Sequence, residues 1–158
     1  MDFSFQIYSA RNFQPYEDVL RTLADLGYAE VEGFGGVYDD PKGFRAALDQ
    51  NGLKMPSGHF GIDMLENDFD GAVEIAKTLG VRVIICPFLM PDDRPKDAEG
   101  WKSFAHRLAA VGEKCQAAGF GFAWHNHDFE FKALPDGSIP QKIILDHAPK
   151  IGWEMDVA

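Results

Sequence analysis

The feature that most constrains the fold of this chain is a unit that recurs five times along it. In each unit, a segment with helical periodicity ends at a glycine, and a short apolar run follows at once. Glycine closes helices because it adopts the left-handed backbone conformation without steric cost. The five glycines are Gly27, Gly52, Gly80, Gly119 and Gly152. With a first strand expected over residues 3–8, the pattern predicts six strands alternating with five helices.

The alternation of strands and helices predicts a parallel sheet. Each of the five glycines is followed by an apolar residue, as expected for strands that are buried on both faces. Right-handed crossovers through helices join such strands into a parallel sheet, which is either open or closed into a barrel. The fold class is therefore α/β.

Chain length bears on the choice between the open sheet and the barrel. A complete (β/α) barrel has eight units and about 250 residues, whereas this chain has 158 residues and supplies six strands. No GxGxxG or GxxxxGK[ST] sequence follows any expected strand, which disfavours a nucleotide-binding open sheet. The length fits one domain over residues 1–158. The pattern alone leaves both architectures open.

Composition excludes several classes of partner. The formal net charge is −10 and no two Lys or Arg residues are adjacent, so nucleic acid is not expected to bind. The two cysteines, Cys86 and Cys115, have no CxxC spacing, which indicates free thiols in a reducing compartment. Neither a signal peptide nor a membrane span is recognisable, so we expect a cytoplasmic protein without a membrane partner.

Polar and titratable residues gather where the expected strands end. In a parallel α/β fold, the carboxyl ends of the strands meet on one face. Unpaired buried charge is costly, so packing alone does not explain such groups at the ends of apolar strands. The positions at the expected strand ends are Tyr8 with Arg11, Glu32, His59, Pro87, residues 125–130 and Asp156, and Pro87 is the exception to their polar character. This face is the predicted site.

The densest part of this face is the sequence WHNHDFEF, residues 124–131. Imidazole and carboxylate groups are the ligands that Mn, Zn and Co ions prefer in proteins. If the strand continues through this stretch, His125 and His127 lie on one side, and Asn126 and Asp128 lie on the other. The alternative is a hydrogen-bonded core histidine beside solvated acids.

Structural roles remain open for several other candidates. Asp156 could be the N-cap of a following helix, His59 could cap the helix after it, and Glu32 could be a solvated loop acid. Arg11 beside Tyr8 could hold a phosphate or a sugar hydroxyl. His106 and His147 lie on expected helices and are interpreted as structural.

The chain resembles the N-terminal part of a sugar phosphate isomerase/epimerase, in the family of barrels related to xylose isomerase and endonuclease IV. The stretch WHNHDFEF carries the strongest similarity. The other matching stretches are QIYSARN, LADLGYAEVEGFGG, LDQNGLKMPSGHFGID, the sequence that leads from GWKSFAHRL into WHNHDFEF, and IGWEMDV. They are spread over nearly all of the chain.

This resemblance implies an eight-stranded barrel with a divalent metal (Mn, Mg, Co or Zn) held by two Glu, one Asp and one His. It implies that Asp156 and Glu130 are metal ligands, with His125 as a rival for the position of Glu130. Two of the family's ligands come from the seventh and eighth strands, which this sequence lacks. The resemblance therefore also predicts that the chain is a fragment, a truncated barrel of about six strands.

The implied activity is isomerisation or epimerisation of a sugar or keto-sugar through an enediolate. In this reading the catalytic residues are Glu130, His125, His127 and His59, and the substrate-binding residues are Tyr8, Arg11, Glu32 and Asn126. Three alternatives remain: a dehydratase or lyase on the same scaffold, a non-catalytic sugar-binding module, and a DNA-repair endonuclease, which the negative charge disfavours. Assembly into a homo-oligomer is left open.

Overall fold

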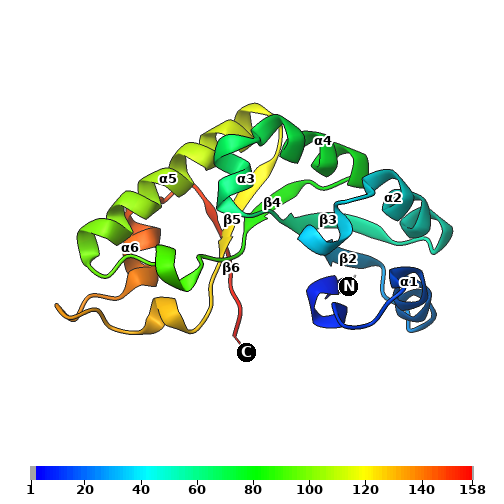
Figure 1. Ribbon diagram of the computed structural model, residues 1–158, viewed down its shortest axis with the longest axis horizontal. Coiled ribbons are helices and arrows are strands. Elements are labelled where there is room, and N and C mark those ends of the chain that lie inside the picture. The colour runs from blue at the N-terminus through cyan, green and yellow to red at the C-terminus, as the bar shows by residue number, and fades with distance from the viewer. Residues whose placement is uncertain (1–2, 158) are drawn as a thin grey trace.

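The computed structural model describes residues 3–157 and shows one parallel sheet that curves into an arc (Figure 1). Its strands follow the chain order, so that each new strand joins the edge formed by the previous one. The strands are β1 Ser4–Gln6, β2 Glu30–Gly33, β3 Lys54–His59, β4 Val83–Cys86, β5 Gly121–His125 and β6 Gly152–Glu154. This is a barrel-type sheet that remains open between β1 and β6.

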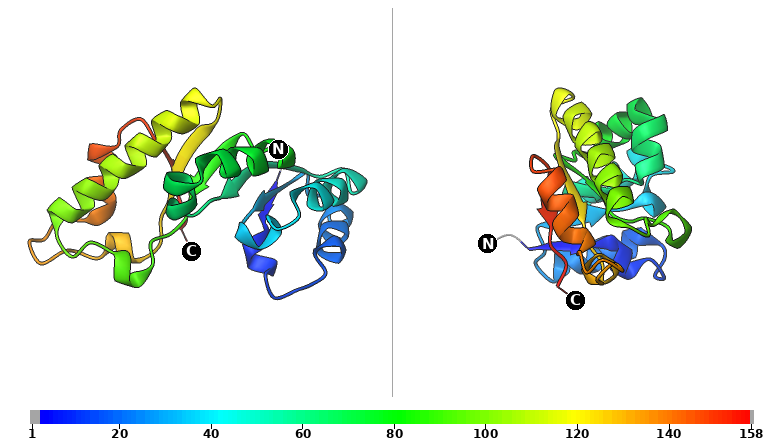
Figure 2. Two further views of the ribbon diagram at one scale, coloured as in Figure 1. Left: turned by 45° about the horizontal axis from the view of Figure 1, so that its top comes forward. Right: turned by 90° about the vertical axis from the view of Figure 1, so that its left-hand side faces the viewer.

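Helices cross over between the strands. They are α1 Tyr16–Asp25, α2 Pro41–Gln50, α3 Ile62–Asn67, α4 Phe69–Leu79, α5 Ala98–Ala117 and α6 Pro140–His147. In Figure 1, α2, α4 and α5 follow the outer side of the arc, and Figure 2 shows the first and last units at its two ends. The predicted alternation and parallel sheet are confirmed. The expected count of five helices is wrong, because the segment after β3 forms the additional helix α3.

The predicted role of glycine holds at four of the five positions. Gly27, Gly52, Gly80 and Gly119 have φ values of 86°, 66°, 81° and 90°, in the left-handed region. Gly152 does not, and instead begins β6. A Cβ atom at Gly152 would lie 3.2 Å from Cβ of Ala123 and 3.3 Å from the carbonyl oxygen of Phe122. This glycine therefore allows β6 to approach β5 closely.

Three helices begin with the same capping arrangement, an aspartate followed three residues later by a glycine. The aspartate side chain accepts a hydrogen bond from the glycine N–H, which satisfies one of the free donors of the first turn. The pairs are Asp40 with Gly43 in α2, Asp68 with Gly71 in α4, and Asp97 with Gly100 in α5. These caps fix where the crossovers turn back toward the sheet.

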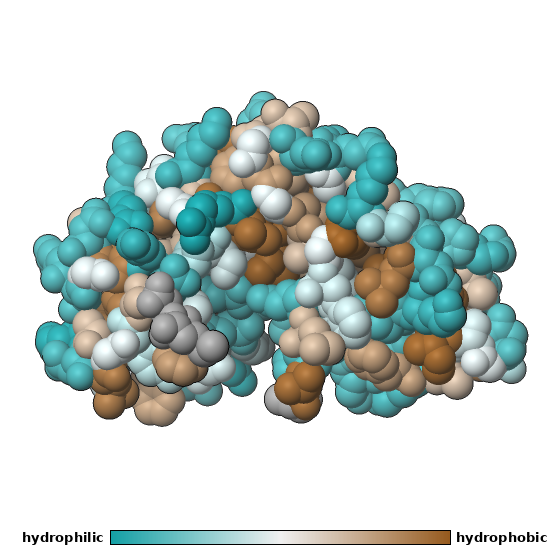
Figure 3. Space-filling model, turned by 180° about the vertical axis from the view of Figure 1, so that it is seen from behind, coloured by the Kyte–Doolittle hydropathy of each residue, from teal (hydrophilic) through white to brown (hydrophobic). Residues whose placement is uncertain are grey.

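The core lies between the sheet and its helices. Ile84 of β4 is fully buried, as are Leu48 of α2 and Leu108 of α5, and the neighbouring Ile85 is 2% exposed. Burial of successive residues shows that β4 is covered on both faces, as the apolar runs predicted. Toward the edge, Trp153 of β6 is 38% exposed. Figure 3 shows apolar patches among polar side chains on one face of the molecule.

The first strand is shorter than the expected range of residues 3–8. It ends at Gln6, and residues Ile7–Ala10 form a short 3-10 turn, η1. Tyr8 therefore lies beyond the strand. Within residues 3–157, no helix has both the length and the apolar character that a membrane crossing requires.

Candidate metal and sugar site

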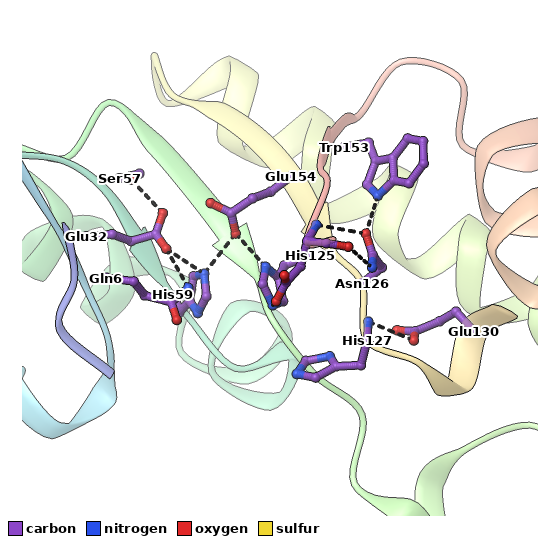
Figure 4. Close-up of polar contacts among 11 residues, drawn as sticks. Gln6, Glu32, Ser57, His59, His125, Asn126, His127, Glu130, Trp153 and Glu154 are labelled. Atoms are coloured by element: carbon purple, nitrogen blue, oxygen red, sulfur yellow. Dashed lines mark hydrogen bonds and ion pairs between the residues drawn. The ribbon is translucent and has the colours of Figure 1, made fainter. Parts of the chain in front are cut away.

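The site is built from the carboxyl ends of four strands. Glu32 lies near the end of β2, and His59, His125 and Glu154 are the last residues of β3, β5 and β6. The register places His125 directly beside Glu154. Their side chains converge on the inner side of the curved sheet (Figure 4). Convergence of polar residues at the carboxyl ends of the strands agrees with the expectation from the sequence.

The carboxylate of Glu154 joins two histidines. Its Oε2 lies 2.9 Å from Nε2 of His59 and 2.9 Å from Nδ1 of His125. The two imidazole rings have their centroids 5.0 Å apart. His59 Nε2 also lies 3.0 Å from Oε1 of Glu32. One histidine is therefore shared between two carboxylates, and one carboxylate between two histidines.

Glu32 is held by its neighbours on both sides. Gln6, at the end of β1, donates from Nε2 to Oε1 at 3.0 Å, and Ser57 of β3 donates from its hydroxyl to Oε2 at 2.7 Å. The Glu32 side chain is only 8% exposed. With both oxygens engaged, its carboxylate has a fixed orientation toward His59.

The electrostatics favour a positive charge between these carboxylates. Burial alone would lower the pKa of His59, but hydrogen bonds with Glu154 and Glu32 outweigh it and raise that pKa to about 9. Burial alone would raise the pKa of Glu154, but hydrogen bonds from His125 and His59 hold it well below its usual range. In the metal-free protein the two carboxylates therefore keep His59 protonated. The same negative charges would favour a metal cation at this position.

The same three residues have the donor chemistry of a metal site. One nitrogen from each of His59 and His125 and one oxygen of Glu154 all lie within 4.8 Å of one another. Ligands of a tetrahedral ion, bound at about 2.1 Å, lie roughly 3.4 Å apart. A small outward movement of the hydrogen-bonded groups would thus admit an ion. Two nitrogens and one oxygen fit Zn, Mn or Co better than Mg or Ca.

Asp156 lies at the edge of this group. The strand β6 ends at Glu154, so Asp156 is two residues beyond the strand rather than its last residue as expected. Its Oδ2 lies 3.7 Å from Nε2 of His125, and its side chain is 40% exposed. Asp156 therefore faces the nitrogen of His125 that does not contact Glu154.

Glu154 belongs to this group of residues but is not among the candidates predicted from the sequence. A signal was present, because alternation places Glu154 and Asp156 on one side of the strand and the apolar Trp153 and Met155 on the other. The period of two that indicated a strand also indicated two carboxylates on its inner side.

The stretch after β5 departs from the extended conformation that was expected. The strand ends at His125, and residues Phe129–Phe131 form another short 3-10 turn, η4. His127 nevertheless returns to the side of His125, with their ring centroids 5.0 Å apart. A turn brings the two histidines together, not the alternation of a strand.

Asn126 and Glu130 are buried, and both form hydrogen bonds with main-chain atoms. Asn126 donates from Nδ2 to the carbonyl oxygen of Asp156 at 3.0 Å, and its Oδ1 accepts from the indole N–H of Trp153 at 2.6 Å and from the N–H of Asp156 at 3.2 Å. Glu130 accepts the N–H of His127 at 2.9 Å and lies outside the group of three metal-ligand candidates.

Tyr8 and Arg11 lie together at the first end of the arc. Arg11 is exposed, donates from Nη1 to the carbonyl oxygen of Tyr8 at 3.0 Å, and has its guanidinium 4.3 Å from the centroid of the Tyr8 ring. Tyr8 is 47% exposed. The guanidinium of Arg11 therefore lies against the Tyr8 ring, and Tyr8 lines the cleft beside the histidines.

A cleft of about 560 Å³ opens in front of the histidines and is large enough for a small sugar. Aromatic side chains form much of its wall, which suits the apolar C–H faces of sugar rings. The aromatic residues are Tyr8, Phe34, Tyr38, Phe60 and Phe88, and the polar ones include Gln6, His59, His125, His127 and Asp156. Asn126, Glu130 and Arg11 do not line it.

The curved parallel sheet with its site at the strand ends is the fold of the xylose isomerase-like barrels. A sugar phosphate isomerase/epimerase from Parabacteroides distasonis has a TM-score of 0.84 and 24% identity, over 99% of this chain and 65% of that one. The IOLI protein, solved with a zinc atom bound, has a TM-score of 0.71 and 15% identity, over 97% of this chain and 62% of that one.

A curated relative adds a likeness in sequence. The rhizopine catabolism protein MocC of Rhizobium meliloti is 26% identical over 132 residues, which are 72% of this chain and 40% of that protein. No family model matches the chain. The chain therefore spans 40% of the length of MocC and 65% of the length of the Parabacteroides distasonis protein, less than two thirds of each.

Proposed function

We propose that this chain carries the metal-binding part of an enzyme that isomerises or epimerises a sugar or keto-sugar through an enediolate. The observation that carries the proposal is the shared oxygen of Glu154, which lies 2.9 Å from a nitrogen of His59 and 2.9 Å from a nitrogen of His125. The similarity to a sugar phosphate isomerase/epimerase supports the reaction class.

His59, His125 and Glu154 are the proposed ligands of a divalent ion, and Asp156, 3.7 Å from the other ring nitrogen of His125, is proposed to orient that imidazole. Zn, Mn and Co fit this donor set best, and the zinc atom bound by the IOLI protein supports the assignment. When bound, the ion would stabilise the negative charge that develops on the oxygens of an enediolate.

His127 is the proposed proton acceptor. Burial, together with the nearby His125, lowers the pKa of His127, so its imidazole is neutral at pH 7. Its ring lines the cleft. A neutral imidazole there can take a proton from the carbon next to a sugar carbonyl and return it to the neighbouring carbon, which is isomerisation; epimerisation would also need an acid on the opposite face of the sugar.

Residues in and beside the cleft orient the sugar and the histidines. Glu32 does not line the cleft; its oxygens are engaged by Gln6, Ser57 and His59, so it fixes the orientation of His59. Tyr8 and Phe88 offer aromatic surface to the ring, and Arg11 lies close enough to Tyr8 to meet an anionic group that reaches past it.

Two measurements test this function. Titration with Co²⁺ or Mn²⁺ measures metal affinity for the natural chain, for Glu154→Gln, and for Glu74→Gln, a control at an exposed position of α4. Incubation of a panel of ketoses in D₂O then detects exchange of the proton beside the carbonyl. We expect metal binding that Glu154→Gln lowers at least tenfold, and exchange that needs the metal. Absence of metal binding in the natural chain would overturn the proposal.

A further inference from the structure

Glu130 has the most complete burial of any charged side chain in the described part of the chain, with 0% exposure. Its neighbours in η4 are Phe129 and Phe131. Its Oε1 has no hydrogen-bond partner among the described residues, whereas Oε2 has one. A carboxyl buried this deeply is costly, so the fold must gain something specific from it.

The partner of Oε2 is the main-chain N–H of His127, at 2.9 Å. This N–H lies just beyond the end of β5, where the ladder of strand hydrogen bonds stops. A buried main-chain donor needs an acceptor, and here the side chain three residues later supplies it. The hydrogen bond closes residues 127–130 into a turn instead of letting the strand continue.

The turn decides where the imidazole of His127 lies. Its ring is nearly parallel to that of Phe129, at 13° and 5.7 Å between centroids, and meets the ring of Phe88 edge-on at 4.9 Å. Arg94 supports this frame, because its guanidinium lies 3.6 Å from the centroid of Phe129 and its Nε donates to the carbonyl oxygen of Leu89.

Glu130 and the imidazole lie on opposite sides of the His127 main chain. In Figure 4 the carboxyl of Glu130 points at the backbone nitrogen, while the ring extends the other way, toward His125. The carboxyl is also outside the three residues whose ligand atoms lie within 4.8 Å of one another. Its position therefore favours a role through His127 over direct contact with an ion.

We propose that Glu130 is a positioning residue, which holds the main chain of His127 and thereby fixes the imidazole of His127 in the cleft, and that it is not a metal ligand. This inference rests on the proposed function, in which His127 is the proton acceptor. Burial raises the pKa of Glu130 to about 7, in keeping with a carboxyl that accepts one hydrogen bond in an apolar setting.

The test compares two variants of similar size. Glu130→Gln keeps an oxygen that accepts the N–H of His127, and Glu130→Leu fills the same space without an acceptor. Hydrogen exchange of the His127 amide, followed by NMR, should be about tenfold faster in Glu130→Leu and within about twofold of natural in Glu130→Gln. Nuclear Overhauser contacts between the His127 ring and the rings of Phe88 and Phe129 should be lost only in Glu130→Leu.

Metal affinity distinguishes a residue that positions His127 from a residue that binds the metal. With Co²⁺ as the probe, Glu130→Gln should bind within about twofold of the natural chain, because a lost ligand would cost 10-fold or more and none is lost here. Glu74→Gln is the matched control. The inference is overturned if Glu130→Gln loses as much affinity as Glu154→Gln, or if Glu130→Leu leaves the exchange rate and ring contacts of His127 unchanged.

The two proposals fail in different ways. If the natural chain binds no Co²⁺, the proposed function falls, while amide exchange and the ring contacts still decide whether Glu130 positions His127. If Glu130→Leu does not fold, a natural-like exchange rate in Glu130→Gln supports the hydrogen bond, and a rate about tenfold faster in that folded variant overturns it.

Discussion

His59 and Glu154 are 95 residues apart in the chain and lie on strands that are not neighbours, yet Nε2 of one lies 2.9 Å from Oε2 of the other. The strands β4 and β5 separate β3 from β6 in the sheet. Only the curvature of the sheet brings the two ends within hydrogen-bond distance, as Figure 4 shows. The hydrogen bond between His59 and Glu154 therefore forms only when the sheet has this curvature.

Replacing Glu154 should change the titration of His59. In metal-free protein, Glu154→Gln removes a carboxylate that hydrogen-bonds to His59, so the pKa of His59 should fall from about 9 toward the ordinary value of 6.5. NMR titration of the imidazole resonances measures this. The exposed Glu113→Gln on α5 is the control, and an unchanged pKa in Glu154→Gln would show that the contact is not made in solution.

Binding of a metal should release about one proton. At pH 7.5 His59 is protonated, because its pKa of about 9 lies above that pH, and an imidazole must lose its proton to bind an ion. Calorimetry with Co²⁺ in buffers of different ionisation enthalpy counts the protons. In His59→Ala the released proton should disappear together with much of the affinity. Release of no proton by the natural chain would contradict His59 as a ligand.

Stability of the metal-free protein should fall as pH rises, for two reasons. Glu130 has its pKa raised from 4.5 to about 7, so its contribution is complete below pH 4.5 and is lost as pH approaches 7. His59 has its pKa raised from 6.5 to about 9, so its contribution is complete below pH 6.5 and is lost up to pH 9. Urea unfolding across this range measures both.

A substitution can separate the contribution of Glu130 to the pH dependence of stability from that of His59. The free energy of unfolding of the natural chain should drop by roughly 3 kcal/mol between pH 4.5 and 7 on account of Glu130. Glu130→Gln cannot ionise and should lose this part of the pH dependence, while keeping the decline between pH 6.5 and 9. A natural-like slope below pH 7 in the variant would assign the effect to another group.

Removal of the hydroxyl that holds Glu32 should cost about 1 kcal/mol of stability, because Ser57→Ala leaves a buried carboxylate oxygen without its donor. Urea unfolding at pH 6 gives the value. Ser103→Ala is the matched control, since that hydroxyl is exposed and donates only to the carbonyl oxygen of Glu99 in its own helix. Equal effects of the two substitutions would show that Ser57 does not fix Glu32.

The sequence contained enough to predict the order of elements, because helix-closing glycines and apolar strands are local signals. It also placed His59 and His125 at strand ends, where the structure has them. It could not predict which of these residues meet, since contact between β3 and β6 depends on the curvature of the whole sheet. Curvature has no local sequence signal comparable to a period of two or 3.6.

The turn after β5 escaped prediction for a related reason. Apart from Phe129, residues 125–130 carry polar side chains that fit either an extended strand or a turn. The choice depends on the buried acceptor that Glu130 supplies to the N–H of His127. Glu130 is fully buried although Phe131, the residue after it, is 49% exposed. An acidic residue between two aromatic ones in the sequence suggested a solvated carboxylate or a ligand, and the structure buries it completely.

Asn126 links the chain after β5 to the chain after β6. Its amide binds both the N–H and the carbonyl oxygen of Asp156, so the chain beyond β6 takes its path from a residue at the end of β5. A substitution at position 126 would shift the carboxylate at position 156 without altering it. Because both contacts are to the main chain of Asp156, the path of the chain after β6 depends on the amide of Asn126 and not on the side chain at position 156.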